Sequence, residues 1–176
     1  MISFPSPLHP AVVHFPIVLL LLGMVVAVVA VFLRRWHLPW LAALILVGGA
    51  LGAVVATVTG GEDEEMVDES SPGTEQVLEA HEEWGESTRN VGIGAAVLAV
   101  AAALTANIRM VGRSLSVLAA LVALVAGYSV AQAGHYGGEL VYRHGAGVKT
   151  TGSIRASAPE AAQGEAPQTQ QESDND

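Results

Sequence analysis

Two histidines, His9 and His14, lie in the stretch Leu8–Pro16, directly before a long apolar segment. Ionisable side chains close to a membrane-length helix are costly and often serve a function. Neutral imidazole is an axial ligand of b-type haem, and it also binds zinc and copper ions. The chain has no cysteine, which excludes disulfides, thiolate metal sites and covalently attached c-type haem. Any metal or cofactor must therefore be held by other side chains, with histidine the foremost.

Four uncharged apolar stretches are long enough to form membrane-spanning helices. A helix rises 1.5 Å per residue, so about 20 residues cross a hydrocarbon core of about 30 Å. The four stretches are Phe15–Leu33, Leu38–Gly61, Val91–Ile108 and Ser114–Ala133, the third being short unless its helix already begins near Trp84. With 51% hydrophobic and 14% charged residues, the chain is too apolar for an ordinary soluble domain. The sequence predicts an all-α, four-helix transmembrane bundle, multi-pass in the cytoplasmic (inner) membrane.

The first stretch is predicted to be a retained anchor, because no Lys or Arg precedes it and Arg34 and Arg35 follow it. Those two arginines, with Arg109 and Arg113, make both short loops basic, so the positive-inside rule assigns the loops to the cytoplasm. Both termini are then outside. Because consecutive spans alternate in direction, five of the six histidines gather at the outer end of the bundle, and His37 does not. These five are His9, His14, His81, His135 and His144.

The segments outside the spans have distinct compositions. Eleven acidic residues fall within Glu62–Glu86, where a short amphipathic helix is predicted after Ser71–Pro72, with His81 on its apolar stripe. The glycine-rich segment Gly134–Val148 is predicted to turn sharply and lie back on the bundle end. Residues 8–148 thus form a four-span membrane domain, and residues 149–176 a disordered polar acidic tail. The net charge of −9 argues against a nucleic-acid partner.

Three motifs of this chain resemble those of a known family, the bacterial and archaeal integral membrane proteins that carry domain of unknown function 2231. The motifs are Leu8-His9-Pro10-x-x-Val13-His14-Phe15-Pro16-Ile17, Thr59-Gly60-x-x-Asp63 and Gly137-Gly138-Glu139-Leu140-Val141-Tyr142-Arg143-His144-Gly145-x-Gly147-Val148. The resemblance covers residues 8 to 148, and His81 occupies the place of a histidine that leads into the third span. Some relatives are fused to Rieske-type or cytochrome c-like domains. By association, the resemblance implies electron transfer, with haem b as cofactor and a quinone or an exported redox protein as partner.

Three hypotheses remain open from the sequence. In the first, haem b is held by His14 and His81, with His135 or His144 as alternates, and the chain is an electron-transfer component rather than an enzyme. In the second, the outer histidines, Glu139 and Tyr142 bond to one another and close the bundle end of an accessory membrane protein. In the third, a divalent metal ion is bound by imidazoles and an acidic side chain. The candidate ligands of that metal ion are His9, His14, His81, His144 and Asp63. Small residues on the second span also allow a homo-oligomer.

Overall fold

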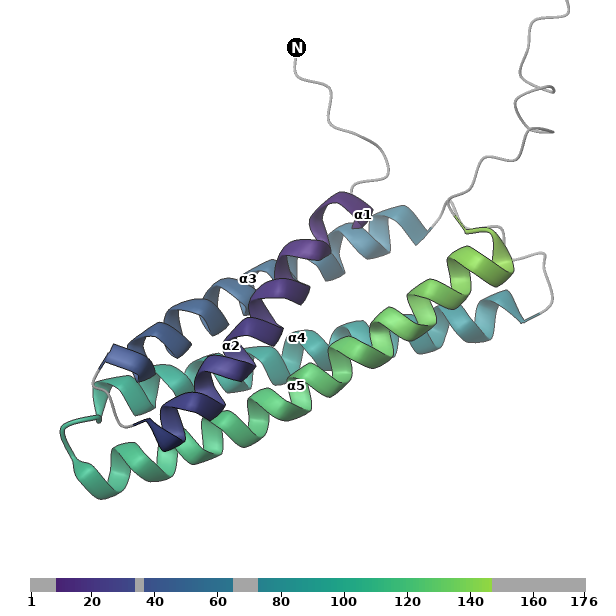
Figure 1. Ribbon diagram of the computed structural model, residues 1–176. Coiled ribbons are helices and arrows are strands. Elements are labelled where there is room, and N and C mark those ends of the chain that lie inside the picture. The colour runs from purple at the N-terminus through teal and green to yellow at the C-terminus, as the bar shows by residue number, and fades with distance from the viewer. Residues whose placement is uncertain (1–8, 34–36, 65–72, 147–176) are drawn as a thin grey trace, which may run out of the picture.

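The computed structural model describes residues 9–33, 37–64 and 73–146, and these residues are almost entirely helical (Figure 1). The helices are α1 (His9–Val12), α2 (His14–Phe32), α3 (His37–Glu64), α4 (Thr74–Leu104) and α5 (Arg109–His144). Helices α1 and α2 follow each other with only Val13 between them and together form one span. Within these described residues, four helical units are long and apolar enough to cross a membrane. The predicted all-α fold with four membrane spans is confirmed.

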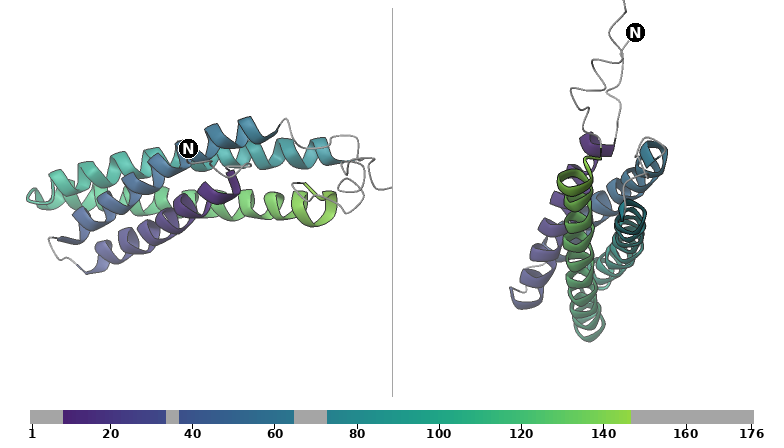
Figure 2. Two further views of the ribbon diagram at one scale, coloured as in Figure 1. Left: turned by 90° about the horizontal axis from the view of Figure 1, so that it is seen from above. Right: turned by 90° about the vertical axis from the view of Figure 1, so that its right-hand side faces the viewer.

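The four spans form a closed ring in which consecutive spans are neighbours. Helix α2 contacts α3, α3 contacts α4, α4 contacts α5, and α5 returns to contact α2. Helices α4 and α5 form the most extensive of these pairs and lie side by side along their lengths (Figures 1 and 2). Because the spans alternate in direction, the ends of four segments meet at each end of the bundle. We call one of these the histidine end: there α1 and α4 begin, and α3 and α5 end.

Small residues hold the helices together at the level of the membrane. Most buried core residues are alanines, and the larger side chains Leu20 and Leu46 are almost completely enclosed. A Cβ atom built on Gly49 would lie 3.0 Å from the backbone nitrogen of Leu20, so α2 and α3 approach each other closely. Large apolar side chains such as Leu44 and Val97 are exposed instead. This distribution suits a bundle that packs through small residues and presents its larger side chains to lipid.

Helices α4 and α5 are longer than the sequence predicted. The amphipathic helix expected before the third span is not separate, because α4 runs without a break from Thr74 to Leu104. The segment Gly134–Val148 does not turn back as expected, since α5 continues as a helix to His144. A helix of 31 residues is about 46 Å long and exceeds the hydrocarbon core of about 30 Å. The extended ends of α4 and α5 support each other by packing together. The predicted tail, residues 149–176, lies outside the described residues.

The turn that was expected within the glycine-rich segment occurs only at its far end. Gly145 has φ of 67°, a left-handed conformation that favours glycine. The amides of Gly145 and Ala146 donate hydrogen bonds back to the carbonyl oxygens of Val141 and Leu140. Gly145 therefore ends α5, whereas the earlier glycines of this segment remain inside the helix at a cost of about 1 kcal/mol each relative to alanine.

Candidate functional site

Two histidines from different helices meet at the histidine end. His9 is the first residue of α1, and His81 lies in the first half of α4. Their ring centres are 6.1 Å apart and their ring planes are nearly perpendicular, at 89°. Both side chains are half-buried. We refer to these two residues as the histidine pair.

Each ring of the histidine pair is fixed by a hydrogen bond to the backbone of another helix. The Nδ1 atom of His9 lies 2.8 Å from the carbonyl oxygen of Ala56 in α3. The Nδ1 atom of His81 lies 2.9 Å from the carbonyl oxygen of Ala133 in α5. A carbonyl oxygen only accepts hydrogen bonds, so Nδ1 is the protonated nitrogen in both rings. In the neutral rings the lone pair that can bind a metal is therefore on Nε2.

Two glycines make room for these rings. A Cβ atom on Gly60 of α3 would lie 3.2 Å from Nδ1 of His9. A Cβ atom on Gly137 of α5 would lie 2.9 Å from Cε1 of His81, closer than a carbon atom normally comes. His9 is thus seated against α3, and His81 against α5. The two rings therefore lie between α1 and α3 on one side and α4 and α5 on the other.

The third histidine with a long-range bond, His144, connects the two ends of the α4–α5 pair. Its Nδ1 atom and the hydroxyl oxygen of Thr74 are 2.9 Å apart. Thr74 is almost fully buried and is the first residue of α4, while His144 is the last residue of α5. This hydrogen bond holds the projecting ends of both helices together.

The remaining predicted ligands are placed differently. His14 is exposed, and its Nδ1–H donates to the carbonyl oxygen of Pro10 one turn earlier, at 3.0 Å. His135 is exposed on α5, where its ring makes an edge contact with Tyr136. Asp63 lies in the last turn of α3. The structure therefore brings His81 together with His9, a residue that the sequence had proposed for a metal ion and not for haem.

The donor set distinguishes between kinds of cofactor. Within residues 9–33, 37–64 and 73–146, no group of three or more His, Cys, Asp or Glu side chains is arranged to hold a metal ion. Structural and catalytic zinc sites use three or four protein ligands, whereas haem iron takes two axial ligands. If the histidine pair bound one haem iron, His9 and His81 would supply its two imidazole ligands. The histidine pair supplies two imidazoles, the number that haem iron takes, and its ring separation of 6.1 Å is also that of an ordinary edge-to-face ring contact.

Sequence reasoning did not find the residues that seat the histidine pair. The acceptors are backbone carbonyls of two alanines, whose side chains carry no chemical signal. The two glycines did leave a signal, because Gly60 and Gly137 both lie in motifs that carry the family resemblance. Gly137 was predicted to belong to a turn, and no role was predicted for Gly60, whereas in the structure both are helical residues beside an imidazole.

Comparison with known proteins identifies one family. The model of the family described as "Predicted membrane protein (DUF2231)" matches residues 5–150, most of the chain. The chain matches no curated protein and no solved structure. The geometry of the histidine pair has to be interpreted from this chain's own residues.

Proposed function

The chain belongs to the DUF2231 family of integral membrane proteins, and from its own geometry we propose that it binds haem b through His9 and His81 and transfers electrons. The observation that carries this proposal is the histidine pair: two imidazoles from different helices, with a ring separation of 6.1 Å. Both rings have their Nδ1–H directed to a helix carbonyl.

The hydrogen bonds of the histidine pair are those that suit a metal ligand. Histidines that bind a metal usually donate their other ring N–H to a carbonyl or carboxylate, which fixes the tautomer and raises the basicity of the ligating nitrogen. The carbonyl oxygens of Ala56 and Ala133 act in this way on His9 and His81. Because both acceptors are helix backbone atoms, they are held rigidly. The rings are thus oriented before any cofactor binds.

The origin of the two ligands also suits a haem. In helix bundles, cofactor sites are built from side chains on facing helices. His9 is seated on α3 and His81 on α5, which are not consecutive in the ring of helices. When bound, haem b supplies a one-electron carrier. His9 and His81 would hold the iron, and the carbonyl oxygens of Ala56 and Ala133 already orient their rings.

The positive-inside rule places the histidine end on the outer side of the cytoplasmic membrane. At that level a membrane quinone and an exported redox protein are both within reach. We propose these two classes as electron donor and acceptor.

A visible spectrum of the purified full chain tests this function. After expression with added haem precursor, or after reconstitution with haem, we expect a b-type band in the reduced-minus-oxidised spectrum. His9→Ala and His81→Ala should each abolish it. His14→Ala and His135→Ala are matched controls, because both residues are exposed and lie in the same half of the bundle. A band that disappears in His14→Ala and persists in His9→Ala would contradict the assignment of His9.

A second candidate function, that of a non-redox accessory protein, is favoured by the helix-to-helix bonds of the histidines. His9 joins α1 to α3, His81 joins α4 to α5, and His144 joins the ends of α4 and α5. In this case the spectrum shows no band after reconstitution. The alanine variants then lower only the thermal stability of the protein. One equivalent of zinc or copper that is lost in His81→Ala would indicate the divalent-metal site instead.

A further inference from the structure

An apolar groove runs between α3 and α4 on the surface of the bundle. It has a volume of about 430 Å³. Three of its residues on α3 are Val47, Leu51 and Val54, and three on α4 are Ile93, Val97 and Val100. On each helix these residues recur at three- or four-residue steps, so they share one face. The groove follows the helix axes for about 10 Å, since seven residues separate its ends on each helix.

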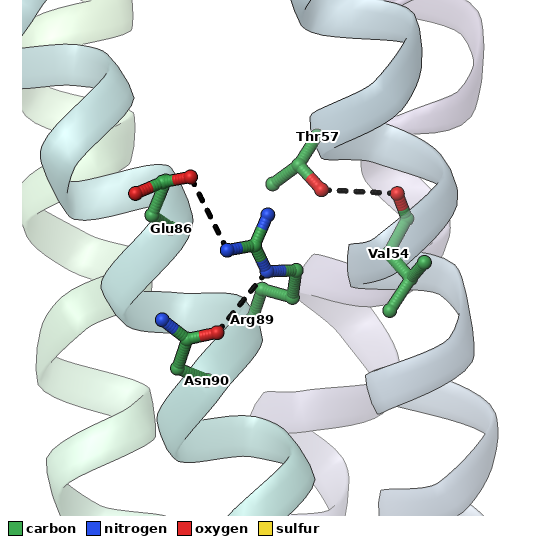
Figure 3. A network of polar contacts seen from close by, with 5 residues as sticks. All are labelled: Val54, Thr57, Glu86, Arg89 and Asn90. Carbon is green, nitrogen blue, oxygen red and sulfur yellow. Dashed lines mark hydrogen bonds and ion pairs between the residues drawn. The ribbon is translucent and has the colours of Figure 1, made fainter.

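A polar cluster lies at the end of the groove nearer the histidine end. Arg89 precedes Ile93 by one helical turn on α4, and Thr57 follows Val54 by one turn on α3. Figure 3 shows the guanidinium group of Arg89 between the two helices, on the side of Thr57. Its Nη2 atom lies 3.2 Å from Glu86, and its Nε atom donates to Asn90 at 3.1 Å. A positively charged group therefore lies at one end of the apolar groove.

The position of Arg89 along the helix corresponds to the boundary between hydrocarbon and headgroups. Arg89 lies 15 residues from Leu104, the last residue of α4, or about 22 Å along the axis. A core of about 30 Å that begins near Leu104 ends within about 8 Å of Arg89, a distance that an arginine side chain covers by extending toward water. Thr57, 20 residues from His37, lies about 30 Å along α3, so α3 reaches the boundary at Thr57.

We propose that the groove and Arg89 form a binding site for an anionic phospholipid. One acyl chain lies in the groove between α3 and α4, and the headgroup phosphate is bound by the guanidinium group of Arg89. Guanidinium donates two parallel hydrogen bonds to phosphate, which a lysine cannot do. The Glu86 side chain is 63% exposed, so its ion pair with Arg89 is weak and can give way to a phosphate.

Charge selects among the lipids that surround the protein. A zwitterionic headgroup carries its own cation next to the phosphate, so it gains little from Arg89. An anionic headgroup has no such internal partner. Each arginine at the membrane surface favours an anionic lipid by an energy that corresponds to about a fivefold preference. The groove by itself would hold either lipid, and Arg89 makes the site selective.

Native mass spectrometry of the full chain in detergent tests the site, with dioleoyl phosphatidylglycerol and dioleoyl phosphatidylcholine as probes. We expect one phosphatidylglycerol to be retained about fivefold more than phosphatidylcholine. Arg89→Gln should lower retention of phosphatidylglycerol to that of phosphatidylcholine, and Arg89→Lys should give an intermediate value. Equal retention of the two lipids by the unaltered protein would overturn the proposal.

Two matched variants separate a specific site from a general effect. Arg143 also pairs with a glutamate on its own helix, at 2.7 Å, but it lies on α5 away from the groove. Arg143→Gln should leave lipid retention unchanged, and an effect as large as that of Arg89→Gln would contradict the site. Val97→Trp fills the groove and should lower retention of both lipids, whereas Val125→Trp, on exposed α5 surface, should not. Unchanged retention in Val97→Trp would also overturn the proposal. None of these readouts depends on haem.

Discussion

Glycines bring helices together in two regions of the molecule, and what fills the space beside them differs. At membrane level, a Cβ atom on Gly23 would lie 2.7 Å from the side chain of Leu46, and one on Gly49 would lie 3.0 Å from Leu20. At the histidine end, Gly60 and Gly137 face imidazole rings at 3.2 and 2.9 Å. The degree of crowding is nearly the same. At membrane level the glycines leave room for leucine side chains, and at the histidine end they leave room for imidazole rings.

The two regions therefore need different support. A leucine beside a glycine needs only to fill space, and dispersion forces hold it there. An imidazole in the same position also needs a partner for its nitrogen atoms, because an unsatisfied buried polar group is costly. The carbonyl oxygens of Ala56 and Ala133 supply that partner. Crowding at membrane level should thus control stability, and crowding at the histidine end should control ring position.

Among the glycine substitutions Gly49→Ala, Gly137→Ala and Gly60→Ala, the first is expected to lower stability most. The added methyl group collides with the backbone nitrogen and side chain of Leu20, so α2 must move away from α3. Overpacking of this kind costs about 1–3 kcal/mol. The measurement is the thermal midpoint in detergent. Gly61→Ala, on the same helix with open space around it, is the control and should be neutral or slightly stabilising. Equal midpoints for the two variants would show that the close approach is not needed.

A smaller effect on stability, but a large one on the site, is expected for Gly137→Ala. The methyl group displaces the ring of His81 and stretches its hydrogen bond to Ala133, an interaction worth about 1 kcal/mol. The gain in helix propensity offsets much of that loss. Nuclear magnetic resonance of ¹⁵N-labelled histidine should show a changed Nδ1 signal for His81. Gly138→Ala is the adjacent control, because nothing lies within 4 Å of its added carbon. If both variants leave the His81 signal unchanged, the ring does not depend on Gly137.

The comparison also shows what a sequence can reveal about this fold. The uncharged apolar runs predicted all four spans correctly, since the cost of burying charge in lipid leaves a clear pattern. The lengths of α4 and α5 were not predicted. The projecting end of α5 contains three glycines, which have low helix propensity, and it stays helical because α4 packs along it. Such mutual support depends on residues more than 40 positions apart, as in the bonds of His81 to Ala133 and Thr74 to His144.

The sequence predicted which histidines lie at the same end of the bundle, but not which of them contact each other. Alternating helices were expected to bring five histidines to one end, and the structure places His9 and His81 in contact there. Which histidine of the first motif faces inward could not be predicted. His9 and His14 are five residues apart, which corresponds to about 140° around a helix, so they point in different directions. Both are flanked by apolar residues. Only the packing of α1 against α3 decides that His9 is the one turned inward.

The smallest effect on stability and ring position is expected for Gly60→Ala. This variant tests whether Gly60 positions the ring of His9 as strictly as Gly137 positions the ring of His81. The added methyl group would lie 3.2 Å from Nδ1 of His9, a less severe contact than the 2.9 Å at Gly137. His9 is also at the start of α1, a helix of four residues, so the ring can move with its backbone. His81 lies within a 31-residue helix and cannot. We therefore expect an unchanged thermal midpoint and a His9 Nδ1 signal that shifts less than the His81 signal does in Gly137→Ala. A shift as large as that one would show that α1 holds His9 as firmly as α4 holds His81.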